Sequence, residues 1–197
     1  MTGAIYIVIG VAALPDPWTG GYVSEAGASS ASQHPLYRVG ILLVSIALGL
    51  LAAAVAAAVA SPVAHPLVPR WFPIGWALLL AAAGLGAVSS RVSCTTGCPL
   101  PPYQTTTARD LVHAGTSVAA VGFVALSMLV LVLTDPPGSV RRLARWGAVV
   151  CWPPLVFLAV AILAVGHGAL TAITERIALA LVLLWALTTA AVIARRL

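Results

Sequence analysis

The sequence carries very little charge. Only 8% of its 197 residues are Asp, Glu, Lys or Arg, and none of the ten basic residues is a lysine. Hydrophobic residues make up 61% of the chain, and the mean hydropathy is +1.05. A water-soluble domain of this size cannot cover so much apolar surface with polar side chains. This deficit excludes a soluble globular protein and places the chain in a lipid bilayer.

Other missing patterns exclude further classes of function. The net charge of +5 is not gathered into a basic stripe, so no nucleic-acid partner is expected. The sequence has no HExxH pattern and no histidine pair at helix-ligand spacing, so we expect no metal site and no cofactor. No basic residue precedes the first apolar run and no small-x-small site follows it, so a cleaved signal peptide is not expected.

Six apolar segments follow one another along the chain, and most have the length of about 20 residues that a bilayer crossing requires. We predict a single all-α domain over residues 1–197, a polytopic bundle of about six transmembrane helices. The first helix is short, because twelve residues rise only about 18 Å against an apolar core of about 30 Å. Pro153-Pro154 is expected to kink the fifth helix. The segments are 3–14, 39–60, 71–88, 111–133, 146–165 and 177–194.

The arginines predict the orientation of these helices. With the amino terminus inside the cell, four arginines and four carboxylates fall on the outer segments, whereas the whole positive excess falls on the inner ones. The positive-inside rule therefore predicts a multi-pass protein of the cell membrane with both termini in the cytoplasm. The inner charges are Arg70, Arg141, Arg142, Arg145, Arg195, Arg196 and Asp135.

On this topology most of the remaining polar residues lie at the outer helix ends. Ionisable groups near a membrane are costly, so their collection suggests a shallow polar site, with Glu25 or Asp110 as base or counter-ion and Arg176 holding an anionic group. The alternative is that these residues are helix caps and salt bridges between outer loops. The catalytic candidates are Glu25, Asp110, His113 and Glu175, and the binding candidates are Arg176 and His167.

Two finer expectations concern the partners of these residues. Asp110 and His113 are three apart, so they share one helix face. Glu25 and His113 are predicted to belong to one cluster, and Glu25 is predicted to have a cationic partner such as Arg176, Arg109 or protonated His113, since an unpaired carboxylate is costly to desolvate.

Cys94 and Cys98 are separated by Thr-Thr-Gly on the predicted outer, oxidising side, where they are close enough to form a disulfide. We favour a structural staple over a redox pair. Redox-active membrane thiols favour a two-residue spacing and need a second thiol relay. Cys151 lies toward the opposite side and is expected to be a small buried hydrophobe.

Several phrases together resemble a bacterial six-helix membrane family catalogued as domain of unknown function 998. The resemblance covers nearly the whole chain, although the first helix is shorter than in the family's pattern. It implies a membrane location and a six-helix architecture, and it implies no particular activity. The phrases are Ser24-Glu25-Ala26-Gly27-Ala28, Leu36-Tyr37-Arg38-Val39-Gly40, the cysteine-bearing outer loop, Leu111-Val112-His113, and Glu175-Arg176 followed by Trp185.

The leading functional prediction is an integral membrane protein of the bacterial cell envelope whose outer polar cluster contacts membrane lipids or a membrane protein partner. A second hypothesis is an intramembrane, lipid-directed hydrolase that uses the Asp, Glu and His side chains. A third is a small transporter or redox accessory subunit.

Overall fold

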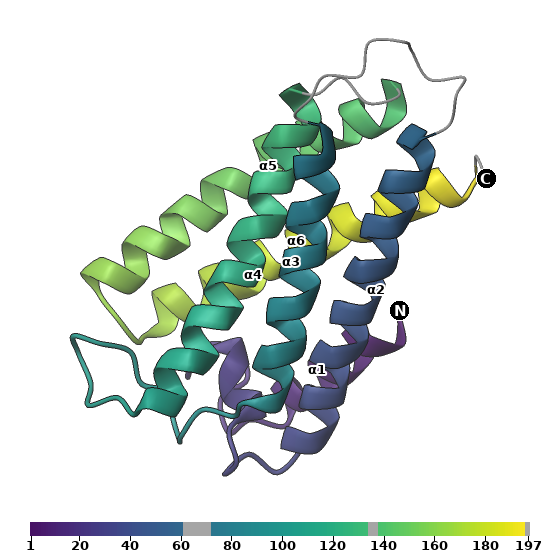
Figure 1. Ribbon diagram of the computed structural model, residues 1–197. Coiled ribbons are helices and arrows are strands. Elements are labelled where there is room, and N and C mark those ends of the chain that lie inside the picture. The colour runs from purple at the N-terminus through teal and green to yellow at the C-terminus, as the bar shows by residue number, and fades with distance from the viewer. Residues whose placement is uncertain (61–71, 134–137, 196–197) are drawn as a thin grey trace.

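The computed structural model describes residues 1–60, 72–133 and 138–195. These residues form six α-helices and one short 3-10 helix, with no β-strand among them, which confirms the predicted all-α bundle (Figure 1). The predicted inner charges Arg70, Asp135 and Arg196 lie outside the described residues. The elements are α1 (Thr2–Ala12), η1 (Val23–Gly27), α2 (His34–Ala60), α3 (Phe72–Arg91), α4 (Ala108–Leu133), α5 (Gly138–Ala164) and α6 (Ala169–Ala194).

Helices α2 to α6 are each long and apolar enough to cross a membrane. Large hydrophobic side chains remain exposed on the helix faces that point away from the bundle, among them Leu50, Leu133 and Leu163. Such surfaces are unfavourable in water and favourable against lipid chains. The chain is therefore built as a multi-pass membrane protein.

Helix α1 is short, as predicted, and it lies along α2. Figure 1 shows it beside α2. Gly3 and Gly40 let the two backbones approach closely, because a Cβ added to Gly40 would lie 2.8 Å from the carbonyl oxygen of Gly3. Met1 lies near Leu51 of α2 and Ala190 of α6.

Helices α2, α3 and α4 pack in sequence order, while α5 packs mainly against α6. The core between them includes Leu79, Met128, Leu131, Cys151 and Trp185. Figure 1 shows α4 and α5 crossing near the end where α5 begins and separating toward the opposite end.

The segments 13–33, 92–107 and 165–168 gather at one end of the bundle, where α4 and α5 separate (Figure 1). We call this the polar end, because all the candidate site residues lie there. The opposite end holds the start of α5 and the end of α6.

Helices α5 and α6 begin about two turns before the apolar runs that predicted them. Helix α5 begins at Gly138, so Arg141, Arg142 and Arg145 lie in its first turns, not in a loop. Long arginine side chains can keep their charge in the polar interface while their stems cover apolar surface. Helix α6 begins at Ala169, which places Glu175 and Arg176 in its second turn instead of at its start.

Helix α5 runs without interruption through Pro153 and Pro154. Neither proline has an N–H group, so the carbonyls of Val149 and Val150 lose their usual helical hydrogen bonds. The two prolines therefore weaken the hydrogen bonding of the helix without ending it.

Candidate functional site

Asp110 caps the start of α4. Its Oδ2 accepts a hydrogen bond from the backbone N–H of Thr107 at 2.9 Å, and the Thr107 hydroxyl accepts one from the N–H of Asp110 at 3.2 Å. This reciprocal pair is a capping box, which satisfies N–H groups that the first helical turn leaves free. The Thr107 hydroxyl also donates to Oδ2 at 2.7 Å.

The same carboxylate fixes the preceding loop. The backbone N–H of Thr95 donates to Oδ1 of Asp110 at 2.7 Å, and the Thr95 hydroxyl lies 3.0 Å from the same oxygen. Asp110 is only 1% exposed. With both oxygens occupied by backbone and hydroxyl donors, Asp110 is a structural anchor, and it has no free oxygen with which to act as a base.

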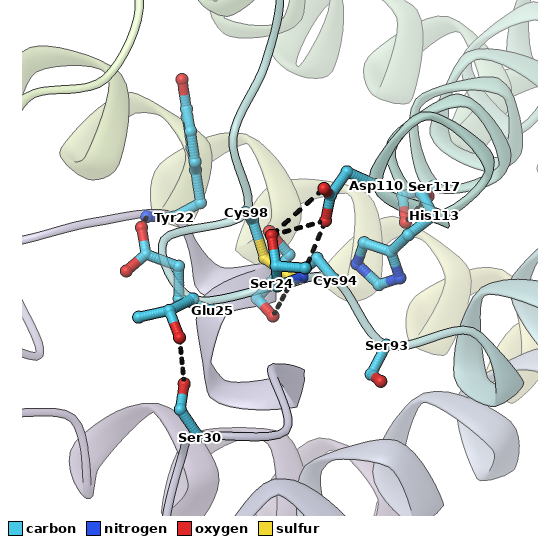
Figure 2. The surroundings of a disulfide bond; sticks show 12 residues. Tyr22, Ser24, Glu25, Ser30, Ser93, Cys94, Cys98, Asp110, His113 and Ser117 are labelled. Atoms are coloured by element: carbon cyan, nitrogen blue, oxygen red, sulfur yellow. Dashed lines mark hydrogen bonds between the residues drawn. A yellow bond between two sulfur atoms is a disulfide. The ribbon is translucent and has the colours of Figure 1, made fainter. Parts of the chain in front are cut away.

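Cys94 and Cys98 are joined by a disulfide beside this anchor, and their Cα atoms are 5.1 Å apart (Figure 2). The intervening turn requires left-handed backbone at Gly97, with φ of +81°, and at Cys98, with φ of +42°. Glycine adopts this conformation without steric cost. The N–H of Cys98 donates to the carbonyl of Thr95, which completes the turn.

His113 lies one turn after Asp110 on the same face of α4, as predicted, and its ring is buried beside the two cysteines (Figure 2). Its Nδ1 lies 2.6 Å from the carbonyl oxygen of Val92 and 3.4 Å from the Ser89 hydroxyl. A carbonyl oxygen only accepts, so Nδ1 carries the proton. Nε2 is buried and has no hydrogen-bond partner among the described residues.

Glu25 has a different partner from those predicted. Its Oε1 lies 2.7 Å from Nε2 of His167, and among the described residues it forms no ion pair with Arg176, Arg109 or His113. The same oxygen accepts the backbone N–H of Tyr22 at 2.8 Å. The carboxylate lies against Gly21, where any Cβ would meet it at 2.2 Å. Glu25 therefore holds the segment before α2 to the α5–α6 connection.

Tyr22 completes this contact. Its ring stacks edge-on against that of His167, with 5.1 Å between the ring centroids. Burial raises the pKa of the Tyr22 phenol, the charge of Glu175 raises it further, and Thr171 partly offsets both. Tyr22 consequently stays protonated and remains a hydrogen-bond donor at neutral pH.

Glu175 and Arg176 both hold the first loop to α6. Oε2 of Glu175 accepts the N–H of Val23 at 2.6 Å. The Arg176 guanidinium donates to the carbonyls of Pro17 and Gly21, both at 2.9 Å. Arg176 thus binds backbone oxygens through Nε and Nη1, while its buried Nη2 has no hydrogen-bond partner among the described residues. The expectation that it holds an anionic group stays a prediction.

A cavity of about 70 Å³ lies between these groups. Its α4 wall is one helical stripe that begins at Asp110 and His113, continues through Ala114 and Ser117, and ends at Val118. Glu175 faces it from α6, and no arginine is among the described residues that line it. The remaining lining residues are Tyr22, Ser24, Cys94, Cys98, Leu100 and Ile162.

The structure brings Asp110, His113, Glu175 and the two cysteines around this cavity, whereas Glu25 and His167 pair beside it and do not line it. Sequence reasoning missed Tyr22, Thr95 and Thr107. The Thr107-x-x-Asp110 pattern was a readable signal, since a threonine three residues before an acidic residue marks a capping box. No sequence pattern marks Tyr22 or Thr95.

Searches of protein-family models, of curated proteins and of solved structures find no match to this chain. The resemblance to the domain of unknown function 998 family therefore stays a prediction.

Proposed function

We propose that this integral membrane protein binds the head of a membrane amphiphile that carries a cationic amine. The polar end is extracytoplasmic in this proposal, and the route of entry lies between α4 and α5, where Val118 and Ile162 line the cavity. The observation that carries it is the α4 stripe, which begins at Asp110 and His113 at the polar end and finishes at the exposed Val118.

The α4 stripe has charged and polar side chains at one end and an apolar side chain at the other, as an amphiphile has a polar head and an apolar chain. Asp110 and His113 lie in the first two turns of α4, and Val118 lies about 12 Å farther along the helix axis than Asp110. Val118 lines the cavity and is also 65% exposed, so the cavity meets the lateral surface of the bundle there. Ile162 of α5 adds a second apolar side chain to the wall. A head group would occupy the polar part, with its chain leaving past Val118.

The charges of the lining favour a cation. Glu175 supplies a carboxylate of which only one oxygen accepts a hydrogen bond from the described residues. Arg176, the nearest guanidinium in sequence, donates from Nε and Nη1 to backbone carbonyls of the first loop and is not among the lining residues of the cavity. An ammonium group can donate to the remaining Glu175 oxygen, whereas an anionic head group would be repelled by it.

The hydrolase hypothesis has less support. A hydrolytic site needs a base within reach of a nucleophile. Asp110 has both oxygens engaged by Thr95 and Thr107, and Glu25 is engaged by His167 and Tyr22. Glu175 and His113 each keep one free atom at the cavity, but no hydroxyl or thiol among the described residues is hydrogen-bonded to that atom. Binding without hydrolysis is therefore the function that the geometry supports best.

Glu175→Gln is expected to weaken retention of phosphatidylethanolamine by about tenfold, because one charge-assisted hydrogen bond contributes about 1.5–3 kcal/mol. The measurement is native mass spectrometry of the full chain in nanodiscs containing phosphatidylethanolamine and phosphatidylglycerol. Asp16→Asn is the matched control, since Asp16 lies exposed in the first loop and bonds only to its neighbours, such as Thr19. Equal retention of both lipids by the unaltered chain would refute the proposal.

The entry route has its own test. Val118→Trp is expected to reduce lipid retention, because the indole would fill the opening of the cavity at the bundle surface. Val149→Trp, at a similarly exposed position on α5, is expected to leave lipid retention unchanged. Loss of retention in both variants would indicate a general effect of the bulky ring and would argue against entry between α4 and α5.

The proposed orientation predicts that a reporter fused after Arg145 is active only in the cytoplasm, because the arginines of the α5 start carry the positive excess. A paired fusion within segment 92–107 is expected to be active only outside. External activity after Arg145 would invert the topology and put the cavity on the cytoplasmic side.

A further inference from the structure

We propose that Cys94, Cys98 and His113 form a binding site for a soft divalent cation, with Zn²⁺ as the best match, when the disulfide is reduced. This site goes beyond amphiphile binding and depends on a different set of atoms. The three side chains each offer one ligand atom, and these atoms all lie within 4.8 Å of one another. All three are buried, at 2%, 6% and 5% exposure.

His113 is oriented as a metal ligand. Its Nδ1–H donates to the carbonyl of Val92 at 2.6 Å, which fixes the tautomer and leaves the lone pair on Nε2. Metal-binding histidines commonly have their other ring nitrogen held in this way. Nε2 is buried with no partner among the described residues. A buried acceptor without a donor is unfavourable, so a cation at this position would satisfy an atom that the fold leaves unpaired.

The cysteines suit the same ion. A spacing of three residues falls within the range of two to four that is common between paired zinc ligands. With Zn–S of about 2.3 Å and Zn–N of about 2.0 Å, tetrahedral ligand atoms lie roughly 3.5–3.8 Å apart. The ligand atoms of Cys94, Cys98 and His113 already lie within 4.8 Å of one another, and reduction frees the two bonded sulfurs to move apart to the tetrahedral spacing.

The fourth tetrahedral position is open to the cavity. Its volume of about 70 Å³ is enough for a water molecule beside the ion. Asp110 also lines the cavity, but its oxygens are held by Thr95 and Thr107 and are not counted as ligands. Two thiolates, an imidazole and a water form a donor set that Zn²⁺ accepts.

Disulfide formation and metal binding exclude each other at this site. A dithiol reductant donates two electrons and two protons to the Cys94–Cys98 bond, which becomes two thiols, while the reductant itself becomes a disulfide. Binding of Zn²⁺ then releases one proton from each thiol. The oxidised chain therefore carries a closed staple, and the reduced chain carries a metal site next to the amphiphile cavity.

The test is a Co²⁺ titration of the full chain in detergent, before and after reduction with a phosphine that is then removed. The reduced chain is expected to bind roughly one Co²⁺ with thiolate charge-transfer bands and tetrahedral d–d bands, and Zn²⁺ is expected to displace it. The oxidised chain is expected to show neither band. Absence of the thiolate band after reduction would overturn the proposal.

Variants identify the ligands. Cys94→Ser and His113→Gln are each expected to weaken binding by at least tenfold, on the scale of losses seen when zinc sites are altered. Cys151→Ser is the matched control, because Cys151 is buried in α5 and belongs to the core away from the polar end. Unchanged binding in Cys94→Ser would count against the site.

A second measurement needs no variant and so does not depend on whether a variant folds. In the reduced, unaltered chain, Zn²⁺ is expected to slow alkylation of Cys94 and Cys98 at least tenfold, as measured by peptide mass spectrometry. Mg²⁺, a cation that prefers oxygen ligands, is expected to give no protection. Equal alkylation rates with and without Zn²⁺ would overturn the proposal.

Discussion

Asp110→Ala is expected to lower the free energy of unfolding by about 3 kcal/mol, because it leaves two buried backbone N–H groups without acceptors and removes a helix cap. The N–H groups are those of Thr95 and Thr107, at 2.7 and 2.9 Å from the carboxylate. For a chain of this length the loss corresponds to a decrease in melting temperature on the order of 10 °C. The measurement is thermal unfolding of the full chain in detergent.

Two further variants separate the contributions of the Asp110 carboxylate and the Thr107 hydroxyl to stability. Asp110→Asn keeps one carbonyl oxygen but presents an NH₂ group to donors, so its loss should lie between those of the parent and alanine variants. Thr107→Val removes the hydroxyl alone and should cost about 1 kcal/mol. Asp16→Ala is the control, since this exposed carboxylate caps only its own turn. Parent-like stability of Asp110→Ala would show that the carboxylate has a role other than anchoring the loop.

The helices were predictable because their signal is strong and local. The runs 39–60 and 111–133 are long and mostly apolar, and they appear in α2 and α4 with the same carboxyl-terminal ends. The polar amino-terminal extensions were not predictable from hydropathy. Helix α6 continues toward the polar end through Thr171 and Thr174, whose hydroxyls donate to carbonyls at 168 and 170, so polar side chains are satisfied within the helix.

The sequence predicted the end of the bundle at which the candidate site residues gather, but it did not predict which of them pair with each other. Counting charge along alternate segments placed Glu25, Asp110, His113 and Glu175 at one end, and the fold gathers them there. Their partners depend on how the loops fold over the helix ends, which no single-sequence pattern encodes. Glu25 pairs with His167, a residue 142 positions away, through a contact that also requires the small residue Gly21 beneath the carboxylate.

The cavity itself depends on the angle between α4 and α5. Hydropathy reports that both helices are apolar, but it contains no information on where they separate. Only the first part of the stripe from Asp110 to Val118 was predictable from the sequence, because Asp110 and His113 were expected to share a helix face. Its continuation to the exposed Val118 and the facing Glu175 emerges only from the packing.

The second large effect is expected in the core, where Gly147 of α5 packs against Trp185 of α6. A Cβ added to Gly147 would lie 2.4 Å from Cδ1 and 2.6 Å from Nε1 of the Trp185 indole. The indole is 5% exposed, and its Nε1 donates to the carbonyl of Leu143 at 3.1 Å. Only a glycine fits at this contact, since the ring cannot move without breaking that hydrogen bond.

Gly147→Ala is therefore expected to destabilise the protein by about 2–4 kcal/mol, the sum of overpacking strain and one lost hydrogen bond. Gly122→Ala is the matched control, because a Cβ at Gly122 of α4 would meet no atom within 4 Å. There the better helix propensity of alanine should leave stability equal or slightly higher. Thermal unfolding in the same detergent compares the two.

A double substitution tests whether the cause is the ring. Trp185→Leu removes the indole, so adding Gly147→Ala to it should cost much less than in the parent, which is the non-additivity expected of residues in direct contact. If the two losses simply add, the effect of Gly147→Ala does not arise at Trp185. Another contact would then set the close packing of α5 against α6. This interface also supports Glu175 on one wall of the cavity.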